Sequence, residues 1–212
     1  MGAGNDQVSG GEGHDTIIAT VGDGNDVYNG GAGTDTYDAS ATTADAVFDL
    51  LAGRATSAEI GDDEIVSFEI VTGSRGDDII IAKLEVNSLS GGSGNDVFVF
   101  GSSAAIGSGS GSRDKILDFD VGDRIDIQEL GNEFADVIED TFGDQDMRKF
   151  VLIDEQAEFT KPGQMRFRYD EFDGETVTIL QGNLDGDAAA EFELELTGRH
   201  ELRDEDFRYS DN

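Results

Sequence analysis

The chain has no cysteine, a single proline and only 14 basic residues among its 212. Without cysteine, disulfide bonds cannot contribute to its stability. Without a basic patch, nothing can neutralise the phosphates of a nucleic acid, so nucleic acid is excluded as a partner. No apolar run is long enough to cross a bilayer, and no charged-then-apolar secretory signal opens the sequence. Because the first residue already falls within a repeat, we expect the chain to be part of a longer protein.

Negative charge is what the chain has in excess. Its 47 acidic residues give a formal net charge of -33, and self-repulsion of this size disfavours a compact state. A disordered chain and a fold that binds cations are both consistent with such a charge. The 13 phenylalanines and 4 tyrosines fall at periodic strand positions, which disorder would not require. We therefore expect a folded chain whose carboxylates bind cations.

A nine-residue pattern, G-G-x-G-x-D-x-U-x with U apolar, recurs along the first half of the chain. It is clearest at residues 10–18, 30–38 and 91–99. Its glycines permit the positive φ angles of a tight turn and leave carbonyls bare, and the aspartate at position six adds a carboxylate. Such oxygens are the ligands that calcium prefers. The x-U-x triplet is a short strand with one inward apolar side chain, so rungs must stack. The pattern predicts an all-β fold, a calcium-bound parallel β-roll.

Counting the pattern divides the chain into four segments. Residues 1–38 hold four rungs, with a two-residue insertion at 19–20, and form a first block of the roll. Residues 39–63 break the register and are interpreted as a strand or hairpin excursion. Residues 64–100 resume the count in weaker form as a second block. Residues 101–212 lack the pattern and are expected to cap the roll.

Successive turns should lie on opposite edges of the roll, so same-edge neighbours are two rungs, or 18 residues, apart. This spacing places Asp78 beside Asp96, and Glu69 beside Asn87, where each pair could share a cation.

In the first block the insertion stretches the spacing, so that Asp6 pairs with Asp26 and Asp15 pairs with Asp35. The turn carbonyls and carboxylates of this block are candidate calcium ligands. They belong to Gly4, Asp6, Gly11, Gly13, Asp15, Gly22, Gly24, Asp26, Gly31, Gly33 and Asp35.

These repeats resemble those of the RTX, or haemolysin-type calcium-binding, family of type I-secreted proteins from Gram-negative bacteria. The second block is more similar still to the C-terminal module of serralysin-type metalloproteases. Residues 68–74 match its Ile-Glu-Asn-like segment and Gly-Ser turn, and residues 95–100 match its G-x-D-x-F-V-F rung. Residues 114–119 and 122–127 match its D-x-I-x-D-F and G-x-D-x-I-D-L segments. The RTX modules of alginate C5-epimerases look similar over the same stretch.

The resemblance implies a secreted, extracellular protein exported by type I secretion machinery, and further calcium ligands. In the second block these are Glu69, Gly76, Asp78, Asn87, Gly92, Gly94 and Asp96. The resemblance also implies a closing site after the last rung, from acidic residues that match Asp114 and Asp123. The family often takes another acidic ligand from the preceding loop, which here, at residues 102–113, has no carboxylate.

The C-terminal half predicts an antiparallel β cap. Residues 150–153 are apolar and predict a buried strand, and residues 165–169 alternate in polarity. Asp173-Gly174 predicts a hairpin that leads into a strand at residues 176–180. Residues 191–196 alternate between apolar side chains and glutamates, which are expected to point outward. Because solenoid ends need polar lids, this region should cover the open end of the roll.

Two further features of this half are less regular. Asn132 could begin a short helix, with Phe134, Val137 and Ile138 on one face, that ends near Gly143. Asn183, Asp185, Asp187 and Glu191 are spaced like EF-hand ligands, but Ala188 and Leu194 stand where that loop needs glycine and glutamate. A bound ion and a plain acidic hairpin are both consistent with this loop.

No catalytic constellation is visible in the sequence. It contains neither H-E-x-x-H nor G-x-S-x-G, and its two histidines, His14 and His200, are expected to be solvated. We therefore expect no enzymatic activity from this chain, which leaves open an enzyme as the parent protein.

Three functional hypotheses follow. The first is a non-catalytic calcium-binding module that stays unfolded in the cytosol, folds on calcium after export, and stabilises its parent protein or supports its secretion. The second is a module for adhesion or for binding an extracellular polysaccharide or another surface ligand. Its only candidate basic clusters are Lys161, Arg166 and Arg168, and Arg199, Arg203 and Arg208. The third is the C-terminal fragment of a secreted metalloprotease or epimerase whose catalytic domain precedes it.

Overall fold

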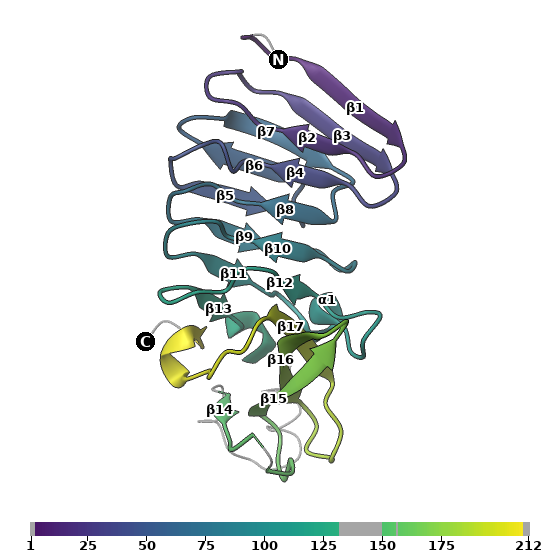
Figure 1. The fold of residues 1–212 in the computed structure, drawn as a ribbon, viewed down its shortest axis with the longest axis vertical. Coiled ribbons are helices and arrows are strands. Elements are labelled where there is room, and N and C mark those ends of the chain that lie inside the picture. Colours follow the sequence, from purple (N-terminus) through teal and green to yellow (C-terminus); the bar gives the residue numbers. More distant parts are fainter. Residues whose placement is uncertain (1–2, 132–149, 156, 210–212) are drawn as a thin grey trace.

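The structure is a computed structural model, and it describes residues 3–131, 150–155 and 157–209. The chain forms an elongated roll of two nine-stranded sheets, with the N-terminus at one end and an antiparallel region at the other (Figure 1). The helix expected from Asn132 lies outside the described residues. None of the described helices is long and apolar enough to cross a membrane.

The two sheets share the repeat strands between them. In spatial order, sheet A contains β1 (Gln7–Glu12), β3 (Val27–Ala32), β7 (Gly61–Val66), β6 (Arg54–Ser57), β5 (Ala46–Asp49), β9 (Ile79–Ile81), β11 (Val97–Val99), β13 (Arg124–Asp126) and β18 (Phe207–Arg208). Sheet B contains β14 (Val151–Leu152), β15 (Gln164–Phe172), β16 (Glu175–Asn183), β17 (Phe192–Thr197), β12 (Lys115–Ile116), β10 (Ser88–Ser90), β8 (Ile70–Thr72), β4 (Thr36–Asp38) and β2 (Thr16–Ile18). A short helix, α1 (Ser103–Ile106), and a 3₁₀ turn, η1 (Asp204–Asp206), complete the described elements.

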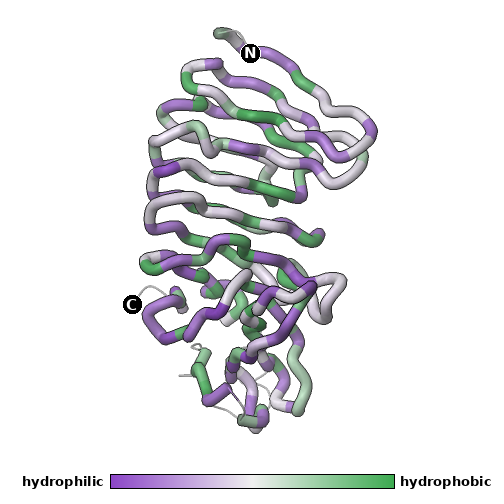
Figure 2. The backbone as a smooth tube through the Cα atoms, in the orientation of Figure 1, coloured by the Kyte–Doolittle hydropathy of each residue, from purple (hydrophilic) through white to green (hydrophobic). Residues whose placement is uncertain are grey.

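The repeat strands form the predicted parallel roll. The chain alternates between sheets, so β1 pairs in parallel with β3 and β2 with β4, as β9 does with β11. The repeat strands each direct an apolar side chain inward, and Ile17, Tyr28, Tyr37, Leu89 and Phe98 are all buried. Hydropathy along the backbone shows the same alternation, rung after rung (Figure 2). The prediction of an all-β roll with an antiparallel cap is confirmed.

The excursion is a three-stranded meander inside sheet A. β6 pairs antiparallel with β5 and β7, while β5 pairs in parallel with β9 and β7 with β3. Its last strand is itself a rung, because a Cβ on Gly61 would lie 2.1 Å from the Gly24 carbonyl oxygen. The rung therefore runs over residues 58–66. The repeat count predicted from the sequence resumes at residue 64, within β7. It still assigns Glu69 to position six, where the structure places it in the second-edge ladder.

The cap continues sheet B rather than covering it as a separate layer. β15, β16 and β17 form an antiparallel meander, and β17 pairs in parallel with β12, the last roll strand of sheet B. Two expectations about this region are wrong. The buried strand expected at residues 150–153 is only the two-residue β14, and Val151 is 50% exposed. Glu195 does not point into solvent but is 4% exposed, because it pairs with Arg113 and Lys115.

Stacked turn glycines give a test of the roll. Gly13 and Gly33 hold the same motif position in neighbouring turns, with φ of 126° and 144°. A Cβ on Gly33 would lie 1.6 Å from the Gly13 oxygen, whereas one on Gly13 would meet nothing within 4 Å. We expect Gly33→Ala to lower the free energy of unfolding by about 1–3 kcal/mol more than Gly13→Ala, since both carry the positive-φ cost. Urea unfolding in saturating calcium measures this difference, and equal losses would contradict the stacking.

Candidate metal centres

The position-six residues form one ladder along each edge of the roll. Within each run of these ladders, except between Glu69 and Asn87, the backbone N–H of one position-six residue donates to the side-chain carboxylate of the next. The first edge, where the chain passes from sheet B to sheet A, carries the runs Asp6, Asp26, Asp63 and Asp78, Asp96, Asp123, with N···O distances of 2.7–2.9 Å. The second edge carries Asp15, Asp35, Glu69, Asn87 and Asp114.

The aspartate pairs expected from the spacing are brought together. Asp26 accepts from the N–H of Asp6 at 2.7 Å, and Asp35 accepts from that of Asp15 at 2.8 Å. In the second block the Asp78 N–H donates to Asp96, also at 2.8 Å. These contacts show adjacency between turns, which is the arrangement that a shared cation requires.

Glu69 and Asn87 are neighbours as expected, but their side chains are partly engaged. The N–H of Ser88 donates to the Glu69 carbonyl at 2.9 Å, which places the two rungs side by side. The Glu69 carboxylate pairs with Lys83 at 3.1 Å, and the Asn87 amide donates to the Lys83 carbonyl. An ammonium group therefore already offsets the charge at this point of the second edge.

Asp114 and Asp123 do not form one closing site. Asp114 precedes β12 of sheet B and accepts from the N–H of Asn87 at 2.7 Å. Asp123 precedes β13 of sheet A and accepts from the N–H of Asp96 at 2.9 Å. The expectation is wrong because each residue ends a different ladder, on a different edge.

The turn glycines bring backbone carbonyls of neighbouring rungs close together. In each stacked pair, a Cβ on the glycine that comes later in the sequence would lie 1.6–2.3 Å from the carbonyl oxygen of the earlier residue. The pairs are Gly24 with Gly4, Gly31 with Gly11, Gly33 with Gly13, Gly92 with Ser74 and Gly94 with Gly76. Gly22 has a φ of 76° and open space beside it. Gly76 is required for space, since a Cβ there would lie 2.5 Å from the Asp45 nitrogen.

The ladders place carboxylates in the interior without matching positive charge. Asp26, Asp35, Asp78, Asp96 and Asp114 are each at most 1% exposed. Burial raises the pKa of Asp96 and of Asp114 to about 7, and the neighbouring carboxylates Asp123 and Asp78 add to the shift at Asp96.

Several of these buried oxygens have no hydrogen-bond partner. They are Asp15 Oδ2, Asp35 Oδ2 and Asn87 Oδ1 on the second edge, and Asp23 Oδ1 on the first. Orphaned carboxylate and amide oxygens beside stacked carbonyls form a hard-oxygen donor set, which fits calcium. The residues present therefore fit the ion that the sequence pattern implies.

Three aspartates of the turns were missed by the sequence reasoning. Asp63 holds position six of the rung inside the meander, and the string from Gly61 to Ile65 carries the signal G-x-D-x-U. Asp118 caps the last full rung by accepting from the N–H groups of Gly91 and Gly92, both at 2.9 Å. Asp23 is 1% exposed at position three, where the motif specifies no residue type. Asp118 is the second aspartate of the D-x-I-x-D-F segment, whereas no sequence signal marks Asp23.

The loop at residues 183–191 is compact and acidic. Asp185, Asp187 and Glu191 each offer an oxygen within 4.8 Å of the others. Asn183 does not join them, because its Oδ1 accepts from the N–H of Gly186 and its Nδ2 donates to the carbonyls of Asp187 and Ala189. The spacing thus produces a carboxylate triad in which the asparagine holds the loop.

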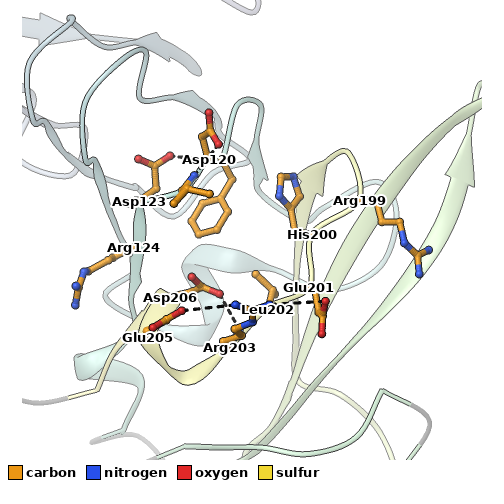
Figure 3. Close-up of a pocket in the computed structure, with 13 residues that line it drawn as sticks. Asp120, Asp123, Arg124, Arg199, His200, Glu201, Leu202, Arg203, Glu205 and Asp206 are labelled. Atoms are coloured by element: carbon orange, nitrogen blue, oxygen red, sulfur yellow. Dashed lines mark hydrogen bonds and ion pairs between the residues drawn. The ribbon is translucent and has the colours of Figure 1, made fainter.

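A groove near the C-terminal end is lined by residues 119–124 and by most of residues 199–206. Figure 3 shows Asp120, Asp123 and Arg124 on one side of this groove and the labelled residues between Arg199 and Asp206 on the other. The His200 ring lies edge-on to Phe119, and its Nε2 is 2.7 Å from the Thr197 carbonyl oxygen. The residues that line the groove include no serine, threonine or cysteine. They offer no nucleophile for His200 to activate.

The basic clusters suggested for an acidic ligand are largely engaged in internal contacts. Arg166 lies over the Phe159 ring at 4.3 Å and donates to Gln181, while Arg168 pairs with Asp170 at 2.7 Å. Arg199 lies over the Tyr169 ring at 3.6 Å. These contacts leave little concentrated positive charge for a polyanion.

The sequence matches two family models, and similar solved structures exist. A family model described as Peptidase M10 serralysin C terminal matches residues 31–208, and one for the RTX calcium-binding nonapeptide repeat, in four copies, matches residues 2–37. No curated protein matches the chain. Solution structures of the AlgE6R2 and AlgE6R3 subunits of the Azotobacter vinelandii mannuronan C5-epimerase are similar at 19% identity, with TM-scores of 0.44 and 0.41. The alignments cover 96% and 97% of this chain, and 91% and 78% of those chains.

Proposed function

The chain belongs to the peptidase M10 serralysin C-terminal family and is a calcium-binding module of RTX repeats, and we propose that calcium drives its folding after secretion. In the cytosol, where calcium is scarce, the carboxylates repel one another and the chain stays unfolded and competent for type I export. Outside the cell, calcium binds the turns and the roll forms. The folded module then stabilises its parent protein or supports its secretion.

The observation that carries this proposal is the row of buried, partly unpartnered carboxylates along both edges. Burying a carboxylate without a counter-charge costs several kcal/mol, so the metal-free roll opposes its own folding at neutral pH. A cation between stacked turns removes this penalty and links two rungs. The same carboxylates therefore destabilise the folded roll without calcium and stabilise it when calcium is bound.

The energies involved are sufficient for such a switch. Extracellular calcium modules bind with dissociation constants of roughly 0.1–1 mM. An ion at about ten times its dissociation constant adds ~1.4 kcal/mol to the stability of the fold. About five such ions would add ~7 kcal/mol, which is the size of a whole domain's stability.

Far-UV circular dichroism tests the proposal directly. We expect a coil spectrum in excess EGTA and a β spectrum in millimolar calcium, with a steep transition between them. Magnesium at the same concentration is the control, because its smaller octahedral shell fits these turns poorly and should leave the coil unchanged. A fully formed β spectrum in excess EGTA would rule out calcium-driven folding, while calorimetry would still report calcium binding.

The two alternatives have less support. A polysaccharide-binding module needs free basic groups, and Arg166, Arg168 and Arg199 already contact aromatic rings or acidic and amide side chains. A catalytic role would belong to another part of a secreted metalloprotease or epimerase, and this chain is not a catalytic domain.

A further inference from the structure

The turn at residues 19–26 differs from the other glycine-rich turns of the first block. It carries the two-residue insertion, and Val21 stands at position one where the motif has glycine. The N–H and hydroxyl of Thr20 both donate to Asp23 Oδ2 at 3.0 Å. This pair of bonds turns the position-three side chain inward, so that Asp23 is 1% exposed. At the same motif position one turn earlier, Glu12 is exposed.

Inside the roll, Asp23 meets two members of the first-edge ladder. The Tyr28 hydroxyl lies 3.2 Å from Asp23 Oδ2 and donates to Asp26 Oδ2 at 2.7 Å, so one hydroxyl contacts both carboxylates. The Tyr37 hydroxyl donates to Asp63 at 3.0 Å, and the two tyrosine rings are 5.6 Å apart. Asp26 and Asp63 are each 1% exposed. The other oxygen of Asp23, Oδ1, is buried and has no partner.

This cluster lacks a positive charge. The ion pairs of the described residues lie elsewhere, and Arg54 of the neighbouring meander pairs with the exposed Asp62 instead. The hydroxyls of Tyr28 and Tyr37 donate hydrogen bonds to these carboxylates and bring no charge. Three buried carboxylates and two neutral hydroxyls therefore require an external cation.

We propose that Asp23 is an additional ligand for a calcium ion at this turn, beside Asp26 and within reach of the charge of Asp63. The inference rests on the proposed calcium function and adds a residue that the nonapeptide pattern does not specify. In the other glycine-rich turns of the first block, the position-six aspartate is the candidate carboxylate ligand. This turn supplies an extra one, with the hydroxyls of Tyr28 and Tyr37 in the outer shell.

Two properties follow from the extra carboxylate. Since affinity at such sites rises with the number of charged ligands, this site fills first as calcium increases. A trivalent lanthanide should also bind here more tightly than at turns with fewer carboxylates. Because Tyr28 and Tyr37 are two of only four tyrosines, and the chain has no tryptophan, excitation of tyrosine would report mainly on an ion at this site.

Terbium titration with tyrosine-sensitised emission tests the proposal on the full chain. In the wild type we expect the sensitised signal to saturate before total terbium binding, measured by calorimetry, is complete. Asp23→Asn should shift the midpoint of the sensitised signal to a roughly 10-fold higher terbium concentration. Tyr28→Phe and Tyr37→Phe keep the packed rings, and together they should abolish most of the signal.

Glu12→Gln is the matched control, because it removes one negative charge at the same motif position but from an exposed side chain. It should leave the midpoint unchanged. A midpoint for Asp23→Asn equal to that of the wild type would overturn the proposal, as would sensitised emission that survives the double phenylalanine variant. If no variant bound terbium or calcium at all, the calcium function itself would fail, which is a distinct result.

Discussion

Asp96→Asn should make the metal-free chain more stable and should reduce the stability that calcium adds. Asp96 is 1% exposed and lies between Asp78 and Asp123 in the first-edge ladder. In the absence of an ion, its charge is buried among other carboxylates. Asparagine keeps one acceptor oxygen for the N–H of Asp78 and removes the charge. The substitution thus separates the cost of the empty turn from the benefit of the filled one.

The direction of the pH dependence follows from the same group. Burial, followed by the charges of Asp123 and Asp78, raises the pKa of Asp96 from 3.8 to about 7 in the metal-free fold. Between those values the folded state binds more protons than the unfolded state, so stability falls as pH rises from about 4 to about 7. The stabilising contribution of Asp96 is therefore fully present below about pH 4 and is lost as the pH rises through about 7. At pH 7.5, Asp96→Asn should recover on the order of 2 kcal/mol of this loss.

Circular dichroism in EGTA measures this effect, with trimethylamine N-oxide added to bring the folded fraction into range. The wild-type β signal should grow as pH is lowered from 8 to 5, and that of Asp96→Asn should change less. In calcium, losing one ion held at ten times its dissociation constant removes about 1.4 kcal/mol. Asp154→Asn, at an exposed position of the cap, is the control and should behave as the wild type. If Asp96→Asn destabilised the chain equally in EGTA and in calcium, the carboxylate would be structural rather than a metal ligand.

The roll was predictable because its information is local. The nine residues of each rung determine its turn, its strand and its inward side chain. Counting along the repeat was therefore enough to place Ile17, Tyr28 and Phe98 in the core. Stacking at fixed spacing then brings Asp78 to Asp96 without knowledge of the rest of the fold. The antiparallel cap followed similarly from alternation in residues 165–169 and from the Asp173-Gly174 turn.

What could not be predicted depends on contacts between distant segments. Asp114 and Asp123 follow each other closely in sequence, but the path from β12 to β13 crosses the roll and separates them onto two edges. Asp63 was hidden because β6 folds back antiparallel, so the rung begins out of phase with the count. Asp23 turns inward only because Thr20 binds it, and nothing in the repeat specifies that bond. Insertions in a repeat array therefore mark the places where counting fails.

The join between roll and cap depends on one buried cation, Arg113. Its Nε and Nη2 contact Glu195 Oε2 at 2.8 and 2.7 Å, and its Nη1 lies 3.3 Å from Glu193. The side chains of Arg113 and Glu195 are 3% and 6% exposed. Arg113 precedes β12, and both glutamates belong to β17. The cluster therefore connects β12, the last roll strand of sheet B, to β17, the cap strand with which it pairs.

Arg113→Met should lower the free energy of unfolding in saturating calcium by about 3–5 kcal/mol, because it leaves Glu195 with Lys115, and Glu193 with a 3.8 Å contact to Arg168, as their remaining cationic partners. Urea unfolding followed by tyrosine fluorescence measures the loss, since Tyr169 and Tyr209 lie in the C-terminal region. Adding Glu195→Gln to Arg113→Met should restore part of the stability, as the uncompensated charge is then gone. Arg54→Met breaks the ion pair with Asp62, whose side chains are 56% and 50% exposed, and should cost less than about 1 kcal/mol. If Arg113→Met cost no more than Arg54→Met, the pairing of β12 with β17 alone would hold the cap to the roll.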